Sequence, residues 1–102
     1  MARKESNRAP REGDQEFEFM AHTRRNKLVG LWAAELLGLI GQAAHDYALD
    51  FARRHGQRPG EEDLVQLLHL DLGGKATLTE IRAKLAHLLD EAKRQLHRER
   101  KD

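Results

Sequence analysis

Apolar residues in this chain recur at steps of three, four and seven positions in four successive segments, and this spacing limits the possible folds most strongly. The first segment carries Phe17, Met20, Ala21, Leu28, Leu31 and Trp32. The second carries Ala44, Tyr47, Ala48, Phe51 and Ala52. The third carries Leu64, Leu67, Leu68 and Leu72, and the fourth carries Ile81, Leu85, Leu88, Leu89, Ala92 and Leu96. Because this spacing gathers apolar side chains on one helix face, the sequence predicts four amphipathic helices.

Residues that start and stop helices separate these segments. Asp14 is a predicted N-cap for the first helix, and Gly38 and Gly41 mark its predicted end. Thr77, with Glu80 three positions later, predicts a capping box at the start of the fourth helix. No alternating strand pattern or internal repeat competes with this interpretation. Helices joined by such short links predict an all-α fold, a four-helix bundle.

The bundle is expected to occupy residues 14–97 and to have a core of Leu and Ala, since only 5% of the residues are aromatic and 39% are apolar. Residues 1–13 carry basic side chains and lack large apolar ones beyond Met1, so we expect a disordered N-terminal tail there. Residues 98–102 are expected to form a frayed, basic C-terminal tail.

Composition excludes several classes of partner and location. The chain has no Cys, which removes disulfides and thiolate metal sites and favours a cytoplasmic location. Its longest apolar window, residues 28–40, contains Glu35 and is shorter than the about 20 residues that span a bilayer, so we expect no membrane insertion. The pI of about 8.2 lies below the value of about 9 that is typical of nucleic-acid-binding domains. We therefore expect no nucleic-acid partner.

Residue types and spacing argue against an enzyme, a metal site or a required cofactor. The six His residues show no pair four positions apart, and we expect them at the surface or at the boundary of the core. Ser6 is the one serine and falls in the predicted tail. Folded structure would therefore not hold a base and an orienting group next to it, as a serine nucleophile requires. Lys75 follows two glycines but precedes Ala76, which is not the pattern of a phosphate loop.

A basic run interrupts the apolar stripe of the first helix. Arg24, Arg25 and Lys27 flank Asn26, and Trp32 follows about two turns later. One interpretation is a solvated helix face, because long basic side chains commonly lie on such faces. The other is an anion site, since guanidinium and ammonium groups hold phosphate. Trp32 would then either stack on a ligand or pack in the core.

The same region resembles a known family. Residues 24–35 read Arg-Arg-Asn-Lys-Leu-Val-Gly-Leu-Trp-Ala-Ala-Glu and are followed by Leu-Leu-Gly-Leu, which closely resembles the signature of the alphaproteobacterial ATP synthase zeta subunit, an ATPase inhibitor. Further similar positions are Tyr47 and Ala48, residues 60–64, residues 80–82, and Leu88 and Leu89. The resemblance covers residues 14–97, with the second half looser.

The resemblance implies a four-helix bundle that binds the catalytic head of ATP synthase, formed by its alpha, beta and gamma subunits, and restrains ATP hydrolysis. It also implies a bundle that binds ADP or ATP as a regulatory ligand. In the family the inhibitory element is an N-terminal segment that becomes helical as it enters the catalytic interface. The chain would then act in the cytoplasm, at the inner face of the membrane through ATP synthase.

The N-terminal segment departs from the family pattern. Asn7 and Arg11 fall where the family has Phe residues spaced four apart, and Pro10 lies between them. Proline destabilises a helix interior by about 3 kcal/mol. Phe17 and Phe19 remain as candidate partner-binding residues at the start of the bundle. We therefore predict a zeta-like subunit whose inhibitory activity is weak or lost.

Two alternatives stay open. The first is a helical nucleotide sensor without ATPase inhibition, in which Arg24, Arg25, Asn26 and Lys27 meet the phosphates and Trp32 or Tyr47 packs near the base. The second is binding to nucleic acid or a membrane surface through the two basic tails. We rank the second last, because short basic termini commonly serve solubility.

Overall fold

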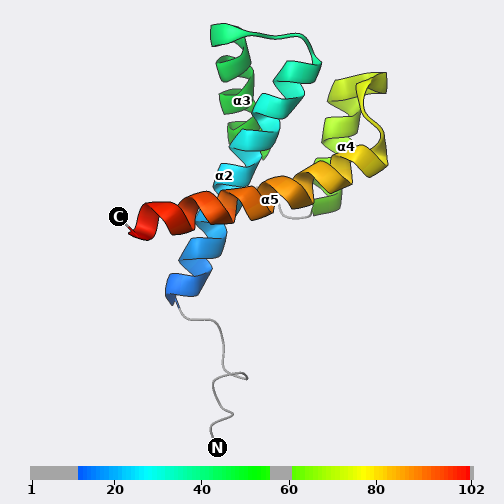
Figure 1. Ribbon diagram of the computed structural model, residues 1–102. Helices are drawn as coiled ribbons and strands as arrows, with labels where there is room; N and C mark the ends of the chain where they lie inside the picture. Colours follow the sequence, from blue (N-terminus) through cyan, green and yellow to red (C-terminus); the bar gives the residue numbers. More distant parts are fainter. Residues whose placement is uncertain (1–11, 56–60, 102) are drawn as a thin grey trace, which may run out of the picture.

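The computed structural model describes residues 12–55 and 61–101, and within these residues it contains four α-helices and no strand. The helices are α2 (Glu12–Leu36), α3 (Gly41–His55), α4 (Glu61–Leu72) and α5 (Leu78–Lys101), with a 3-10 turn, η1 (Gly73–Lys75), between the last two. Helix α3 lies beside the second half of α2, α5 crosses α2, and α4 lies beside the first half of α5 (Figure 1). The predicted all-α class with four helices is confirmed.

Residues close to the helix ends determine where α2 ends and where α5 begins. Helix α2 ends in a Schellman motif, in which the Leu39 amide donates to the Ala34 carbonyl at 2.9 Å and the Gly38 amide donates to the Glu35 carbonyl at 3.0 Å. Gly38 has φ +83, a conformation that glycine adopts without steric cost. The predicted end at Gly38 is therefore confirmed.

The start of α5 also follows the sequence. The Thr77 amide donates to Oε1 of Glu80 at 2.9 Å, and the Glu80 amide donates to Oγ1 of Thr77 at 3.1 Å. These two reciprocal bonds form the predicted capping box.

The start of α2 differs from the prediction. Helix α2 begins at Glu12, so Asp14 lies inside the first turn and is not the N-cap. At the other end of the chain, α5 continues to Lys101. Contacts of Glu99 and Arg100 with α2 stabilise this last turn. The residues of the expected tails at 1–11 and 102 lie outside the described part of the chain.

The core draws side chains from all four helices. Its largest fully buried members are Val29, Phe51, Val65, Leu68, Leu72, Ile81 and Leu85. Trp32 and Tyr47 are partly buried and pack against this cluster. Met20, which we expected on the apolar stripe of the first helix, is 42% exposed. The stripe prediction fails there because α2 packs against α3 at Gly30 and against α5 at Trp32, which lie about 200° apart around the helix, so its apolar residues do not share one face.

Helices α2 and α3 approach closely at Gly30. A Cβ atom on Gly30 would lie 3.0 Å from the Cα atom and 3.3 Å from the Cβ atom of Ala48. The Ala48 Cα belongs to the backbone of α3, so the whole helix would have to move to relieve this contact. Glycine at position 30 therefore allows the close spacing of the two helices.

We expect Gly30→Ala to destabilise the fold by about 1–3 kcal/mol, because overpacking outweighs the gain of about 1 kcal/mol in helix propensity. Chemical denaturation followed by circular dichroism measures this change. Gly74→Ala is the matched control, since nothing lies within 4 Å of a Cβ atom at that position. Equal stability of the Gly30→Ala variant and the native chain would contradict the packing argument.

Candidate functional site

The basic run of α2 does not form one surface. Successive residues of an α-helix are turned by about 100°, so Arg25 and Lys27 lie about 200° apart around the helix axis. Arg25 is 3% exposed, whereas Lys27 is exposed. The side chains of the run therefore point to different neighbours.

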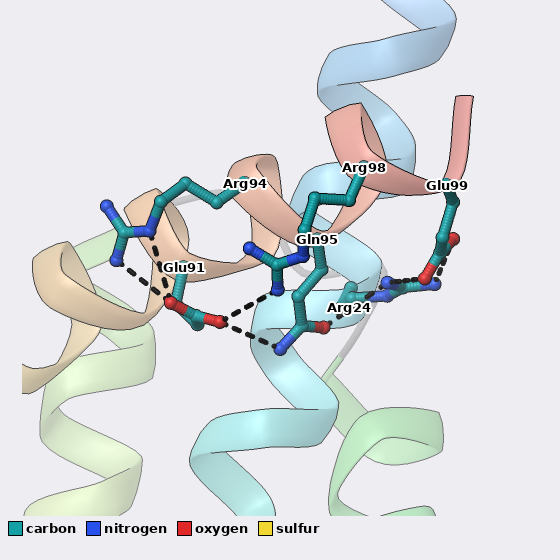
Figure 2. Close-up of polar contacts among 6 residues, drawn as sticks. All are labelled: Arg24, Glu91, Arg94, Gln95, Arg98 and Glu99. Carbon is teal, nitrogen blue, oxygen red and sulfur yellow. Dashed lines mark hydrogen bonds and ion pairs between the residues drawn. The ribbon is translucent and has the colours of Figure 1, made fainter. Parts of the chain in front are cut away.

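Arg24 faces the last turns of α5. Its Nη2 atom donates to Oε1 of Glu99 at 3.0 Å, its Nη1 atom donates to Oε2 of the same carboxylate, and Nη1 also donates to Oε1 of Gln95 at 3.2 Å (Figure 2). This paired hydrogen bond raises the pKa of Arg24 and lowers the pKa of Glu99. Arg24 therefore connects α2 to α5 through side-chain hydrogen bonds.

The same cluster continues along α5. Gln95 donates through Nε2 to Oε2 of Glu91 at 3.2 Å, and Arg94 donates to Oε1 of Glu91 at 2.9 Å (Figure 2). Arg98 lies 3.6 Å from the same carboxylate. Hydrogen bonds from Arg94 and Gln95 lower the pKa of Glu91. The carboxylate stays charged and gathers these donors on one face of α5.

Arg25 ties α2 to the start of α4. Its Nε atom donates to Oδ1 of Asn26 at 2.8 Å, and its Nη1 atom donates to Oε2 of Glu61 at 2.7 Å. Asn26 is itself 4% exposed. A buried guanidinium without such partners would be strongly destabilising, so these contacts are required for the packing of the site. An anion bound at Arg25 would have to compete with Glu61.

Trp32 borders an open hollow between α2 and the segment from η1 to α5. The Nζ atom of Lys84 lies 5.6 Å from the centroid of the Trp32 ring, a cation–π geometry. The hollow measures about 430 Å³, and Lys75, Glu80 and His87 also line it. Sequence reasoning missed Lys84 and His87, because only the docking of α5 on α2 brings them to Trp32.

Tyr47 bridges α3 and α4. Its hydroxyl donates to Oδ2 of Asp71 at 3.0 Å, and its ring stacks with Phe51 at a centroid distance of 6.3 Å. Burial, followed by the hydrogen bond to Asp71, raises the pKa of Tyr47 to about 12. Trp32 faces Lys84 of α5 whereas Tyr47 faces Asp71 of α4, so the two rings have different neighbours.

Phe17 and Phe19 lie on opposite sides of α2, about 200° apart. The Phe17 ring is half-buried, 4.7 Å from the ring of His97 and 4.9 Å from Cζ of Arg100. Phe19 is 67% exposed. Of the two candidate partner-binding residues, Phe19 is open to solvent and Phe17 is covered by α5.

One histidine differs from the expected surface or boundary position. His55 is 7% exposed, and its ring meets the ring of Phe51 edge-on at 4.6 Å. The prediction is wrong for this residue because His55 lies four positions after the buried Phe51 and so on the same face of α3. Within residues 12–55 and 61–101, His and acidic side chains do not gather in a group of three that would hold a metal ion. Each helix in that part of the chain is too short or too polar to cross a membrane.

The single tyrosine allows a direct titration. We expect absorbance at 295 nm to report a pKa of about 12 for Tyr47, and Asp71→Asn to lower it while leaving it above the ordinary value of 10.0, because burial is the larger cause. Since the pKa is higher in the folded chain, the stability from this group is present below pH 10 and is lost between about pH 10 and 12. Asp50→Asn serves as control and should shift the pKa less. Equal shifts in the two variants would count against the bond to Asp71.

Comparison with protein families places these helices in a family. The model of the family described as ATPase inhibitor subunit zeta matches residues 2–95. Neither the comparison with curated proteins nor that with solved structures gives a significant match. The match spans nearly the whole chain and includes the basic run, the Trp32 hollow and both Phe residues at the start of α2. The chain therefore belongs to the ATPase inhibitor subunit zeta family.

Proposed function

We propose that this chain is a regulatory subunit that docks on the catalytic head of ATP synthase, made of alpha, beta and gamma subunits, at the inner face of the membrane. The match of the zeta family over residues 2–95 carries this proposal. The exposed Phe19 is compatible with it, since aromatic side chains are enriched at protein interfaces. Docking of this kind involves no catalytic step in the chain itself.

The inhibitory activity of this subunit is proposed to be weak or lost. An arm that folds on binding needs apolar anchors along one helix face. At the positions where the family pattern has Phe, this chain has Asn7 and Arg11, with Pro10 between them. The polar side chains contribute little apolar burial, and the proline opposes the helix. The chain then docks through its bundle but holds the catalytic interface poorly.

Restoring the arm tests this proposal. We expect the variant Asn7→Phe, Pro10→Ala, Arg11→Phe to inhibit ATP hydrolysis by the isolated catalytic head at a concentration roughly tenfold lower than the native chain requires, because two aromatic anchors are regained. A matched variant with Ala at all three positions removes the proline without adding anchors, and it should gain less. Binding of each chain to the head is measured in parallel by surface plasmon resonance.

Two results would contradict the proposal. Full inhibition by the native chain near equimolar concentration would show that its arm is intact. If neither the native nor the restored chain binds the catalytic head, the proposed docking itself is wrong.

A second candidate function is the binding of an adenine nucleotide as a regulatory ligand, and the hollow beside Trp32 favours it. Its volume of about 430 Å³ lies in the range of about 300–1,000 Å³ that small-molecule pockets occupy. Trp32 offers a ring for the base, and the ammonium groups of Lys75 and Lys84 offer charge for the phosphates. The basic run remains the other proposed phosphate site, with Arg24, Arg25, Asn26 and Lys27 as its groups.

Fluorescence of the single tryptophan separates the two phosphate sites. We expect ADP to change Trp32 emission, and Lys84→Ala to weaken ADP binding roughly tenfold through loss of a charged contact. Lys27→Ala is the matched control, because it removes one exposed lysine from the basic run. If Lys27→Ala weakens binding and Lys84→Ala does not, the phosphates lie at the basic run. If ADP changes neither the Trp32 emission nor the amide chemical shifts of the native chain, the proposed nucleotide binding is wrong.

A further inference from the structure

The last turns of α5 hold the first half of α2 through a set of side-chain contacts that lie outside the main core, and we call this set the clasp. The α2 side of the clasp consists of Phe17, Glu18 and Arg24, and the α5 side consists of Lys93, Gln95, His97, Glu99 and Arg100. The clasp joins residues that are more than 70 positions apart in the chain, so it is a tertiary contact.

The aromatic part of the clasp covers Phe17. The rings of Phe17 and His97 are tilted by 35° at a centroid distance of 4.7 Å, and the guanidinium of Arg100 lies over the Phe17 ring at 4.9 Å. Phe19 differs sharply, because it points away from α5 and is 67% exposed. A partner that reaches Phe17 must therefore displace the end of α5, whereas a partner that reaches Phe19 need not.

The ionic part of the clasp is open to solvent. Nζ of Lys93 lies 3.3 Å from Oε2 of Glu18, whose side chain is 52% exposed. Arg24 meets Glu99, whose side chain is 57% exposed. Ion pairs at such exposed positions are weak and screened by salt. These contacts orient the end of α5 without fixing it irreversibly.

Little apolar surface supports the clasp. Ala21 and Ala92 are fully buried and Leu96 is 4% exposed, but none of the three belongs to the main core cluster. Two of these side chains are single methyl groups, so release of the last turns of α5 uncovers chiefly the ring of Phe17 and the side chain of Leu96. None of the clasp residues belongs to the main core, which includes Val29, Phe51 and Leu85.

We propose that the end of α5 is an autoinhibitory cover for Phe17. When the chain docks on the catalytic head, Phe17 loses its contacts with His97 and Arg100 and contacts the head instead. This inference rests on the proposed function, which supplies the partner for Phe17. The affinity of a covered site is reduced by the fraction of molecules in which the cover is closed. Removal of the cover therefore strengthens docking even though it removes contacts within the chain.

The variant His97→Ala, Arg100→Ala in the full-length chain tests the cover. We expect its binding to the isolated catalytic head to be roughly threefold to tenfold tighter than that of the native chain, because an aromatic contact and a cation–π contact no longer compete. Hydrogen exchange of the amides in the first half of α2 should become faster in the free variant. Phe17→Ala should weaken binding to the head.

Arg98→Ala is the matched control. It removes the same positive charge from the same end of α5, but Arg98 pairs with Glu91 of its own helix and not with α2 (Figure 2). Its binding and its hydrogen exchange in α2 should stay near those of the native chain. Equal strengthening by Arg98→Ala and by the double variant would overturn the cover and assign the effect to charge alone.

The outcomes separate the inference from the function on which it rests. If the native chain binds, Phe17→Ala weakens binding and the double variant binds no more tightly than the native chain, the cover is overturned while docking stands. Unchanged hydrogen exchange in the double variant also overturns it. If no form of the chain binds the head, the proposed function fails, and the inference fails with it.

Discussion

Helix α2 contacts α3, α4 and α5, so its surface must serve three neighbours at once, and the arrangement of the molecule depends on this constraint. The contact with α3 uses the smallest residue, since Gly30 allows the backbone of α3 at Ala48 to approach closely. The contact with α5 runs from Trp32 and Lys84 to the clasp at Phe17. Apolar and small residues are consequently distributed around α2, which explains why the stripe expected there is incomplete at Met20.

The basic run shows how one sequence motif can serve tertiary structure and binding together. Arg24 holds Glu99 of α5, and Arg25 holds Glu61 of α4 from a buried position. Lys27 is exposed on another side of the helix. Any anion that meets the two arginines has to compete with carboxylates already in place. Within residues 12–55 and 61–101, Lys84 beside Trp32 forms no ion pair with a carboxylate, although Glu80 lines the same hollow.

We propose that three parts of the chain have separate regulatory roles: the first half of α2, the second half of α2 and the segment that precedes α2. The second half of α2 contributes Val29 and Ala33 to the main core, and no clasp residue belongs to that core. The first half carries Phe17 under a weak, solvent-exposed clasp and Phe19 in the open. Because no clasp residue belongs to the main core, we expect release of the clasp to leave that core in place. A docking residue can in this way be held back without loss of the fold.

The sequence alone determined the features that depend on residues within about four positions of one another. The helical periodicity, the end of α2 at Gly38 and the capping box of Thr77 and Glu80 are of this kind, and the structure confirms them. The family resemblance added the expected bundle. Only the tertiary structure decided that Arg25 is buried against Glu61, that Tyr47 bonds Asp71 and that α5 covers Phe17. These pairs are 24 to 80 positions apart, and the way in which the helices pack, which no local pattern encodes, brings them together.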